Sequence, residues 1–394
     1  MTPRERLLAV LNRQIPDCVP VMPDLSNMVP ARLTGKPFWD LYLYNDPPLW
    51  EAYINCAKHF NLDALMDGFP LTFGGPNAAF MDGVFDLPSD FGEQDTSGPQ
   101  WQRFIVFKSD ERIVTQSCCI DKGRRIWAPT VEVYYVADPP TIFVPPEKIG
   151  LPKVPKKWQP LEGIKPVDIG PQGLKRAKKL LGDQGLIGTF LTASSVFCRP
   201  EHIYKYYDNP DKHQQWAAER IERMERRFEQ IMAMEVKPDF LCVGGSGTLI
   251  FQNIEIFRKF TFPAVKRGIE LATEAGFFTH VHSCGPEKEL VKIFAEETEL
   301  TVIDPLEIPP MGDCNLAELK KLYGDKIVLK GNLHTTAVML HGSVGDVIAA
   351  SKKAIDDAGE GGGFILSTGD QCGRDTPDEN IFAMIETART YGRY

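Results

Sequence analysis

The stretch LTVIDPLEIPPMGDCNLAELKKLYGDKIVLKGN, at residues 300–332, contains one complete repeat of the pattern that decides the fold. An apolar strand is predicted at 300–304, a helix at 315–323 and a second apolar strand at 326–330. Strands whose sequences are continuous apolar runs are typical of parallel sheets that are buried on both faces. The stretch therefore predicts a strand–helix–strand unit of a parallel sheet.

The same unit recurs on both sides of this stretch. Further strands are predicted at 18–22, 63–66, 186–190, 239–243, 277–281 and 363–367. Further helices are predicted at 3–13, 47–60, 210–234, 257–275, 287–296, 344–358 and 378–391. About eight buried strands that alternate with helices predict an α/β fold of the (β/α)8 TIM-barrel type. An open doubly wound sheet is the alternative, but no GxGxxG motif follows the first strand.

The alternation breaks between residues 73 and 160. Hairpin strands are predicted in this region at 101–107, 112–120 and 125–136, with a turn at 121–123. The proline-rich stretch 139–160 is predicted to be an extended connector rather than a packed element. We therefore predict a single barrel domain over 1–394. It carries a β-hairpin and proline-rich insertion at 73–160, after the second strand.

Composition and charge argue against two classes of function. The 394-residue chain is 43% hydrophobic and 25% charged, which is the balance of a soluble globular protein. The formal net charge is -9 and no Lys/Arg stripe is present, so binding to nucleic acid is not expected. No apolar run approaches the roughly 18–20 residues that a membrane helix needs.

The N-terminus and the cysteines predict a location in the cytoplasm. The opening residues 1–6 are charged and lead into an amphipathic helix, which is unlike a signal peptide. The nine cysteines are odd in number and scattered through core-like sequence. Such thiols are typical of a reducing compartment, where they serve packing, metal binding or catalysis.

Polar residues gather in the loops after the predicted strands, where the active site of a barrel lies. His282 and Cys284 follow the fifth strand, and Cys372 follows the eighth. Three ligands of mixed nitrogen and sulfur type, with a vacant fourth position, suit a catalytic zinc ion. His280 faces the same side of its strand as His282 and is a reserve ligand. Core packing is the alternative role for each free cysteine.

Three further loop residues are candidates for catalysis. Asp304 and Glu307 follow the sixth strand and are predicted to act as acid/base groups or to support the metal ligands. Their alternative is to solvate a loop that prolines make rigid. His334 follows the seventh strand and is predicted to hydrogen-bond a substrate, with a role at the start of a helix as the alternative.

The glycine-rich loop after the fourth strand is a candidate for cofactor binding. Glycines let a backbone approach a phosphate or a corrinoid closely. A tight turn that ends the strand is the alternative. The residues concerned are Gly244, Gly245 and Ser246.

Several stretches of the chain resemble the uroporphyrinogen-decarboxylase superfamily. They are ERLLA at 5–9, PDCVPV at 16–21, TGKPFW at 34–39, DPLE at 304–307, GD at 312–313 and KGN at 330–332. The likeness spans nearly the whole chain, and residues 73–160 are its least typical part. It implies a (β/α)8 barrel, in agreement with the strand count.

Within that superfamily, the chain resembles the methyltransferases more than the decarboxylases. Decarboxylases hold porphyrin carboxylates with an arginine-rich segment after the first strand, whereas this chain has PDLSNMVP at 23–30. Corrinoid-linked methyltransferases bind zinc through a His-x-Cys and a distant Cys, a pattern that His282, Cys284 and Cys372 match. The resemblance implies a zinc-dependent methyltransferase that uses a corrinoid (cobalamin) carried by a separate protein.

Two directions of methyl transfer are consistent with this resemblance. Zinc could polarise a methyl ether while the corrinoid cobalt takes the methyl group, or it could activate a thiol such as coenzyme M that accepts the methyl group from a methyl-corrinoid. We favour O-demethylation of aromatic methyl ethers, because aromatic residues of the insertion could cover an apolar pocket. These residues are Trp101, Phe104, Phe107, Trp127, Tyr134 and Tyr135.

The same aromatic residues have other uses that the sequence leaves open. They could pack the insertion onto the barrel, or they could form the interface of a homodimer. Two other functions also stay open. One is a uroporphyrinogen-type decarboxylase, and the other is a corrinoid- or tetrapyrrole-binding protein with a vestigial site.

Overall fold

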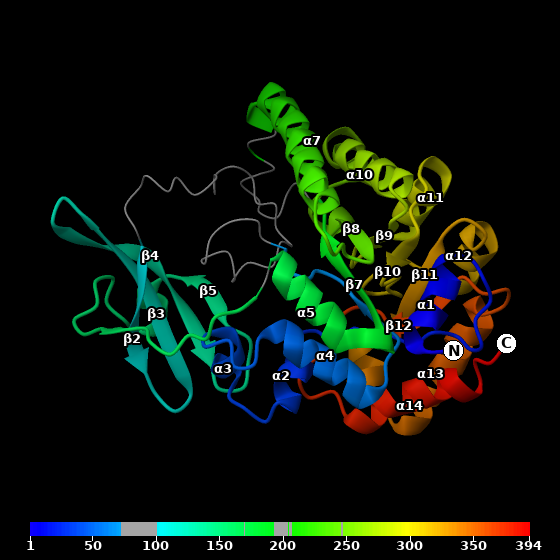
Figure 1. Cartoon of the computed structure of the whole chain (residues 1–394), viewed down its shortest axis with the longest axis horizontal. Helices are drawn as coiled ribbons and strands as arrows, with labels where there is room; N and C mark the ends of the chain where they lie inside the picture. Colours follow the sequence, from blue (N-terminus) through cyan, green and yellow to red (C-terminus); the bar gives the residue numbers. More distant parts are fainter. Residues whose placement is uncertain (72–100, 169, 193–203, 205–206, 246) are drawn as a thin grey trace. The chain divides into compact units, whose positions relative to one another are not determined.

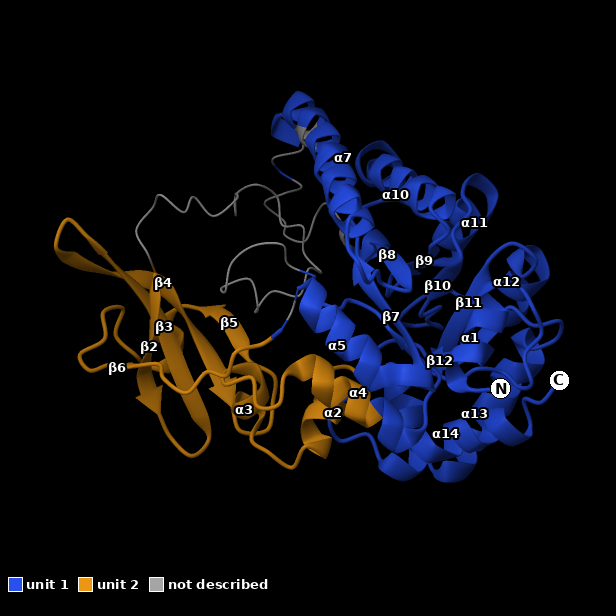
Figure 2. Ribbon diagram, in the orientation of Figure 1, with its two compact units in different colours: residues 1–25, 57–86, 168–394 blue, residues 26–56, 87–167 orange. Residues whose placement is uncertain are grey.

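The computed structural model describes residues 1–71, 101–168, 170–192, 204, 207–245 and 247–394 (Figure 1). The chain divides into two compact units (Figure 2). The first comprises Met1–Leu25, Ala57–Asp86 and Asp168–Tyr394, and the second comprises Ser26–Cys56 and Leu87–Val167. The strands of the first unit form a parallel sheet, and those of the second form an antiparallel sheet.

Seven parallel strands form the sheet of the first unit (Figure 1). In spatial order they are β1 (Ala64–Met66), β7 (Gly185–Phe190), β8 (Phe240–Gly244), β9 (Phe278–His282), β10 (Val302–Asp304), β11 (Val328–Leu333) and β12 (Phe364–Thr368). Most of their residues are buried, as the continuous apolar runs predicted. The α/β fold with a curled parallel sheet is therefore confirmed.

The segment predicted as the first strand, 18–22, lies between the two edges of this sheet. Val21 forms a parallel bridge with Leu366 of β12, and its carbonyl accepts a hydrogen bond from Asp63 N, just before β1, at 3.1 Å. Pro20 and Pro23 flank this bridge and lack the backbone N–H that a longer ladder would need. Seven strands of the predicted barrel are thus present as a ladder, and the eighth is present as this bridging segment.

Helices follow the strands of the first unit, and several begin at side-chain caps. Thr2 and Ser343 form capping boxes at α1 and α13, which satisfy backbone donors that the first turn of a helix leaves unpaired. Near the sheet, α10 packs on β8 and β9, α13 on β11 and β12, and α5 on β7. None of the helices in the described part of the chain is long and apolar enough to cross a membrane.

Helices occur in both units of the chain. They are α1 (Pro3–Leu11), α2 (Met28–Leu33), α3 (Phe38–Tyr42), α4 (Leu49–Phe60), η3 (Pro146–Ile149), α5 (Pro171–Leu181), η4 (Gly182–Gln184), α7 (Pro210–Met232), α8 (Thr248–Phe251), α9 (Ile254–Ile256), η5 (Phe257–Thr261), α10 (Phe262–Glu274), α11 (Lys288–Glu297), α12 (Leu316–Tyr323), η6 (Thr335–Leu340), α13 (Val344–Ala358) and α14 (Asp378–Thr390). The long helices match the predicted ones to within a few residues at most ends, whereas α5 and the short α2, α3, α8 and α9 were not predicted.

The second unit contains a five-stranded antiparallel sheet. In spatial order its strands are β5 (Thr141–Val144), β4 (Arg124–Tyr135), β3 (Arg112–Asp121), β2 (Gln102–Lys108) and β6 (Gln159–Pro160). The stretch 139–160 was predicted to be an unpaired connector, but it supplies β5 and β6. Both are edge strands, where a proline is tolerated because one side of the strand makes no ladder hydrogen bonds. The bounds 73–160 stay a prediction, because residues 72–100 lie outside the described part.

Aromatic residues of the insertion pack within this antiparallel sheet. The ring of Trp127 lies 5.6 Å from that of Phe104 and 5.4 Å from that of Trp158. Tyr134 is fully buried, and its hydroxyl donates a hydrogen bond to Glu132 at 2.6 Å. Phe104, Trp127 and Tyr134 therefore have a packing role in the second unit. The expectation that they cover a substrate pocket stays a prediction.

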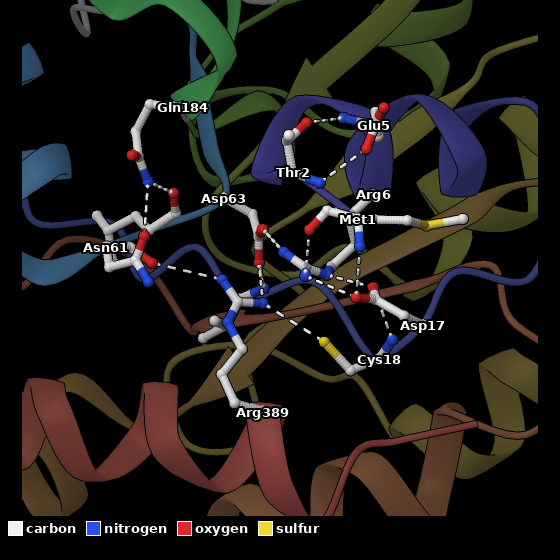
Figure 3. A network of polar contacts seen from close by, with 12 residues as sticks. Met1, Thr2, Glu5, Arg6, Asp17, Cys18, Asn61, Asp63, Gln184 and Arg389 are labelled. Atoms are coloured by element: carbon white, nitrogen blue, oxygen red, sulfur yellow. Dashed lines mark hydrogen bonds and ion pairs between the residues drawn. The ribbon is translucent and has the colours of Figure 1, made fainter.

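An ion-pair network in the first unit joins both ends of the chain to the start of β1 (Figure 3). The buried carboxylate of Asp63 accepts hydrogen bonds from Arg6 Nη1 at 2.5 Å, from Arg389 Nη1 at 2.7 Å and from Val21 N at 2.8 Å. Arg6 also pairs with Asp17 at 2.7 Å. Since α1 carries Arg6 and α14 carries Arg389, Asp63 ties both terminal helices to the bridging segment.

We expect Asp63→Asn to lower the free energy of unfolding by about 2–3 kcal/mol, because it removes charge-assisted hydrogen bonds from a buried acceptor. The loss is limited because Arg6 keeps Asp17 as a partner. Urea unfolding of both proteins measures the difference. The control is Asp17→Asn, at a side chain that is 42% exposed, which should cost about 1 kcal/mol or less. Equal losses in the two variants would contradict a central role for Asp63.

Candidate active site

Polar residues interrupt three adjacent buried strands of the parallel sheet. His280 and His282 lie in β9, Asp304 ends β10, and Lys330 lies in β11. Asp304 pairs in register with His282. Residues two apart on a strand face the same side, so both histidines are directed to the side on which Asp304 lies.

Asp304 is the centre of this polar cluster. Its Oδ1 lies 2.9 Å from His280 Nε2 and 3.2 Å from His282 Nδ1, and its Oδ2 accepts a hydrogen bond from Lys330 Nζ. Burial by itself would raise the pKa of this carboxyl group. Lys330, His280 and His282 outweigh burial and hold the pKa well below its usual value. Asp304 is therefore an anion that one cation and two imidazoles surround.

The two ring nitrogens of His282 have different partners. Nδ1 faces Asp304, whereas Nε2 lies 3.7 Å from Asp370 Oδ1, and the ring also hydrogen-bonds with the side chain of Cys284. Burial lowers the pKa of His282, but the Asp304 carboxylate and the contact with Cys284 raise it well above its usual value. A carboxylate that holds one ring nitrogen and leaves the other for an ion is typical of metal-binding histidines.

Cys372 lies in the loop after β12, and its side chain is fully buried. Its backbone N–H donates to Asp24 O at 2.7 Å, and its thiol lies close to the side chains of Thr368 and Thr376. Burial raises the pKa of the thiol to about 12. The structure thus brings His282 and Cys284 into contact and places Cys372 two residues from Asp370, which itself lies near His282.

These three residues fit a zinc ion by the chemistry of their donor atoms, one imidazole nitrogen and two sulfurs. In the described part of the chain, however, one group of three brings its ligand atoms within 4.8 Å of one another, and it consists of Asp67, Cys242 and His280. His280, predicted from the sequence as a reserve ligand, is therefore part of a different group. The ligand set of His282, Cys284 and Cys372 stays a prediction.

Two carboxyl groups of raised pKa lie beside the loop that follows His282. Glu307 Oε2 accepts a hydrogen bond from Gly285 N at 2.5 Å, and Glu287 Oε2 accepts one from Leu306 N at 2.6 Å. Burial raises the pKa of both groups, and the nearby Asp304 carboxylate raises that of Glu287 further. Glu287 Oε1 is buried and has no hydrogen-bond partner among the described residues. Both groups therefore hold a proton more strongly than an ordinary glutamate.

The conformation of this loop requires a glycine after Cys284. Gly285 has a φ of +91°, a region that L side chains rarely adopt. A Cβ at this position would also lie 2.6 Å from Ile250 Cγ1. Gly285 thus allows its own N–H to reach Glu307 directly after the His-x-Cys pair.

The other predicted site residues have structural partners. His334 caps η6, and its Nδ1 accepts hydrogen bonds from Thr336 N at 3.2 Å and Ala337 N at 3.1 Å. It also lies close enough to Glu307 to lower the pKa of that carboxyl group. A Cβ on Gly244 would lie 2.7 Å from Val281 Cγ1, so this glycine is required by strand packing.

The remaining members of the glycine-rich loop do not test the cofactor prediction. Gly245 O accepts a hydrogen bond from Thr248 Oγ1 at 3.1 Å, a contact that fits a turn at the end of β8. Ser246 lies outside the described residues. Cofactor binding by Gly244, Gly245 and Ser246, and substrate binding by His334, therefore stay predictions.

Four residues of these groups had no role predicted from the sequence: Asp67, Cys242, Glu287 and Lys330. One signal for Lys330 and Cys242 was present in the sequence. A lysine and a cysteine stand in strands that are otherwise almost wholly apolar, and a charge in such a strand needs a buried partner. For Asp67 and Glu287, which lie in loops, the sequence offers no comparable signal.

The C-terminal part of the chain, which carries the polar cluster, resembles known proteins. Residues 243–391 match the family model of uroporphyrinogen decarboxylase (URO-D). The resemblance to this superfamily is confirmed. Over 139 residues the chain is 29% identical to the methylcobamide:CoM methyltransferase MtbA of Methanosarcina mazei, a match that covers 35% of this chain. It spans only 37% of the length of that relative.

A solved structure shows the same fold over the whole chain. It is a methyltransferase from Methanosarcina mazei, and the alignment has a TM-score of 0.56 at 17% sequence identity. It covers 99% of this chain and 99% of that chain. At this identity the match shows a shared fold alone.

Proposed function

We propose that this chain is a zinc-dependent methyltransferase that moves a methyl group between a small molecule and the cobalt of a corrinoid on a separate protein. The observation that carries the proposal is the contact of His282 with both Asp304 and Cys284. It presents an oriented imidazole nitrogen and a thiol together at the carboxyl end of the sheet. The relative named as a methylcobamide:CoM methyltransferase supports the proposal.

The residues of the site have distinct roles in this proposal. His282, Cys284 and Cys372 would hold the zinc ion, which when bound supplies Lewis acidity toward a substrate oxygen or sulfur. Asp304 fixes the ring of His282 through Nδ1, and this leaves Nε2 available as a ligand. Lys330 neutralises Asp304, so that the buried cluster does not carry an uncompensated negative charge.

As the methyl donor we propose an aromatic methyl ether. When the methyl group leaves, the phenolic oxygen becomes negatively charged and needs a proton. Glu307 has a raised pKa, lies beside the His282 loop, and uses only Oε2 in hydrogen bonds within the described residues. A carboxyl group of raised pKa keeps its proton to a higher pH than an ordinary glutamate, and in its protonated form it can donate that proton to the leaving oxygen. Glu307 therefore supports ether cleavage.

A thiol acceptor is the second candidate, and the name of the relative MtbA favours it. In that direction the small molecule has to lose a proton before it takes up a methyl group. Glu307 would then have to be ionised, which its raised pKa opposes. The two directions differ in their products, and an assay of each separates them: free cob(I)alamin with methoxyaromatics, and methylcobalamin with thiols.

Zinc content tests the proposed ligand set. We expect Cys284→Ser and Cys372→Ser each to lose one zinc ion per chain relative to the wild type, measured by elemental analysis under reducing conditions. Cys56→Ser is the matched control, because Cys56 is a buried thiol in α4 that the proposal does not involve. Both variants should also lose methyl transfer to cob(I)alamin. Unchanged zinc in both would overturn the proposal.

A further inference from the structure

We propose that Asp67, Cys242 and His280 form a second zinc site, distinct from the set His282, Cys284 and Cys372. The three residues come from different elements of the first unit: the loop after β1, the middle of β8 and the middle of β9. Cys242 and His280 pair in register on neighbouring strands. A rigid sheet therefore positions two of the three donor atoms.

The spacing of the donor atoms suits a small cation. Cys242 Sγ and Asp67 Oδ2 each lie 3.8 Å from His280 Nδ1, and all three atoms lie within 4.8 Å of one another. Around a tetrahedral zinc ion the corresponding separations are roughly 3.3–3.6 Å, given metal–ligand bonds of about 2.0–2.3 Å. Small side-chain rotations would bring the atoms to those separations.

The hydrogen bond of His280 with Asp304 directs the lone pair of the other ring nitrogen toward Cys242 and Asp67. Its Nε2 lies 2.9 Å from Asp304 Oδ1, and a carboxylate can only accept, so Nε2 carries the proton. In the neutral ring Nδ1 is then an acceptor, and Cys242 and Asp67 are the groups that face it. A carboxylate behind one nitrogen of a metal-binding imidazole is the usual outer partner that fixes its tautomer.

The donor types select the ion. One imidazole, one thiolate and one carboxylate form a mixed nitrogen, sulfur and oxygen set, which favours zinc over magnesium or calcium. Three protein ligands leave a fourth position for water or for a ligand atom. Asp304 Oδ1 contacts both His280 and His282, so one carboxylate supports the histidine of each proposed site.

Zinc content of single variants tests this inference. The wild type should hold two zinc ions per chain after reconstitution with excess zinc and removal of loosely bound metal. Cys242→Ser and Asp67→Asn should each hold one. The Asp67 side chain is 41% exposed, so its substitution leaves the core intact even if Cys242→Ser fails to fold. Cys56→Ser, with its buried thiol in α4, is the matched control and should keep both ions.

Cobalt(II) in place of zinc gives a readout that does not depend on activity. Its thiolate charge-transfer absorption should fall in Cys242→Ser by the share of one thiolate among three. In Asp67→Asn it should fall by the same share if cobalt no longer binds Cys242, and the absorption from Cys284 and Cys372 should remain in both variants. Loss of zinc in Cys242→Ser and Asp67→Asn but not in Cys56→Ser supports the site. Zinc content equal to that of the wild type in both variants overturns it.

The inference and the proposed function fail in different ways. The wild type could hold only one zinc ion per chain. If Cys284→Ser or Cys372→Ser removes this ion and Asp67→Asn does not, the second site is overturned and the proposed function stands. If Cys242→Ser and Asp67→Asn remove the single ion and Cys284→Ser does not, the result supports the site at Asp67. It also overturns the ligand set on which the proposed function depends.

Discussion

Replacing Asp304 with asparagine is expected to lower the free energy of unfolding by about 3–5 kcal/mol, which is the usual cost of removing one partner of a buried ion pair. The substitution removes the anion that Lys330, His280 and His282 share. Lys330 is buried, and without Asp304 its charge loses its hydrogen-bonded partner. Urea unfolding at pH 7 measures this loss against the wild type.

The same variant should show a characteristic dependence on pH. The pKa of Asp304 is held well below its usual value in the folded chain, so the folded state binds fewer protons than the unfolded state between the two pKa values. Its contribution to stability is complete above the unfolded pKa of about 3.9, and it is lost as the pH falls through the folded pKa. The difference between wild type and Asp304→Asn should therefore shrink below about pH 4.

A double variant distinguishes the effect of losing the carboxylate from the effect of leaving the lysine without its partner. Asp304→Asn combined with Lys330→Met removes both charges of the pair, so it should be more stable than Asp304→Asn alone. Zinc affinity should behave differently, because both histidines still lack the carboxylate that orients them. It should fall about 10–100-fold in the single and the double variant alike. A double variant no more stable than the single one would contradict the role given to Lys330.

The sequence could predict this fold because most of its strands are continuous apolar runs. The segments 186–190, 277–281 and 363–367 could be recognised from such runs alone, and each became a strand within one residue of its predicted ends. The edge strands at 141–144 and 159–160 could not, because proline-rich, partly exposed sequence carries no such pattern. Their pairing depends on neighbours in the sheet and not on local propensity.

The site residues could be predicted only where their position after a predicted strand is enough to place them at the active face of the barrel. His282, Cys284 and Asp304 follow strand ends, so the barrel geometry alone marks them as candidates. The partnership of Cys242 with His280 depends on the register between β8 and β9, which no local pattern specifies. The contact between Glu307 and Gly285 likewise joins two loops through a left-handed glycine. Contacts of this kind arise from tertiary structure and cannot be predicted from a single sequence.

Replacing Glu307 with glutamine is expected to lower kcat/KM for methyl ether cleavage by about 10²–10⁴-fold, the usual contribution of a positioned general acid. Glutamine keeps the size of the side chain and can still accept the hydrogen bond from Gly285 N, so zinc content and folding should be unchanged. The matched control is Glu289→Gln, at a side chain in α11 that is 49% exposed, which should have no effect on rate. Steady-state kinetics with cob(I)alamin and a methoxyaromatic measure both.

The dependence on pH then distinguishes an acid from a group that only positions the loop. Burial raises the pKa of Glu307 above its usual value, and a general acid acts in its protonated form. The wild-type rate should therefore fall as the pH rises through that raised pKa, and Glu307→Gln should lack this descending limb. If the variant is slow but keeps the limb, Glu307 positions the Gly285 loop and another group donates the proton. The buried carboxyl group of Glu287, with its own raised pKa, is then the residue to replace next.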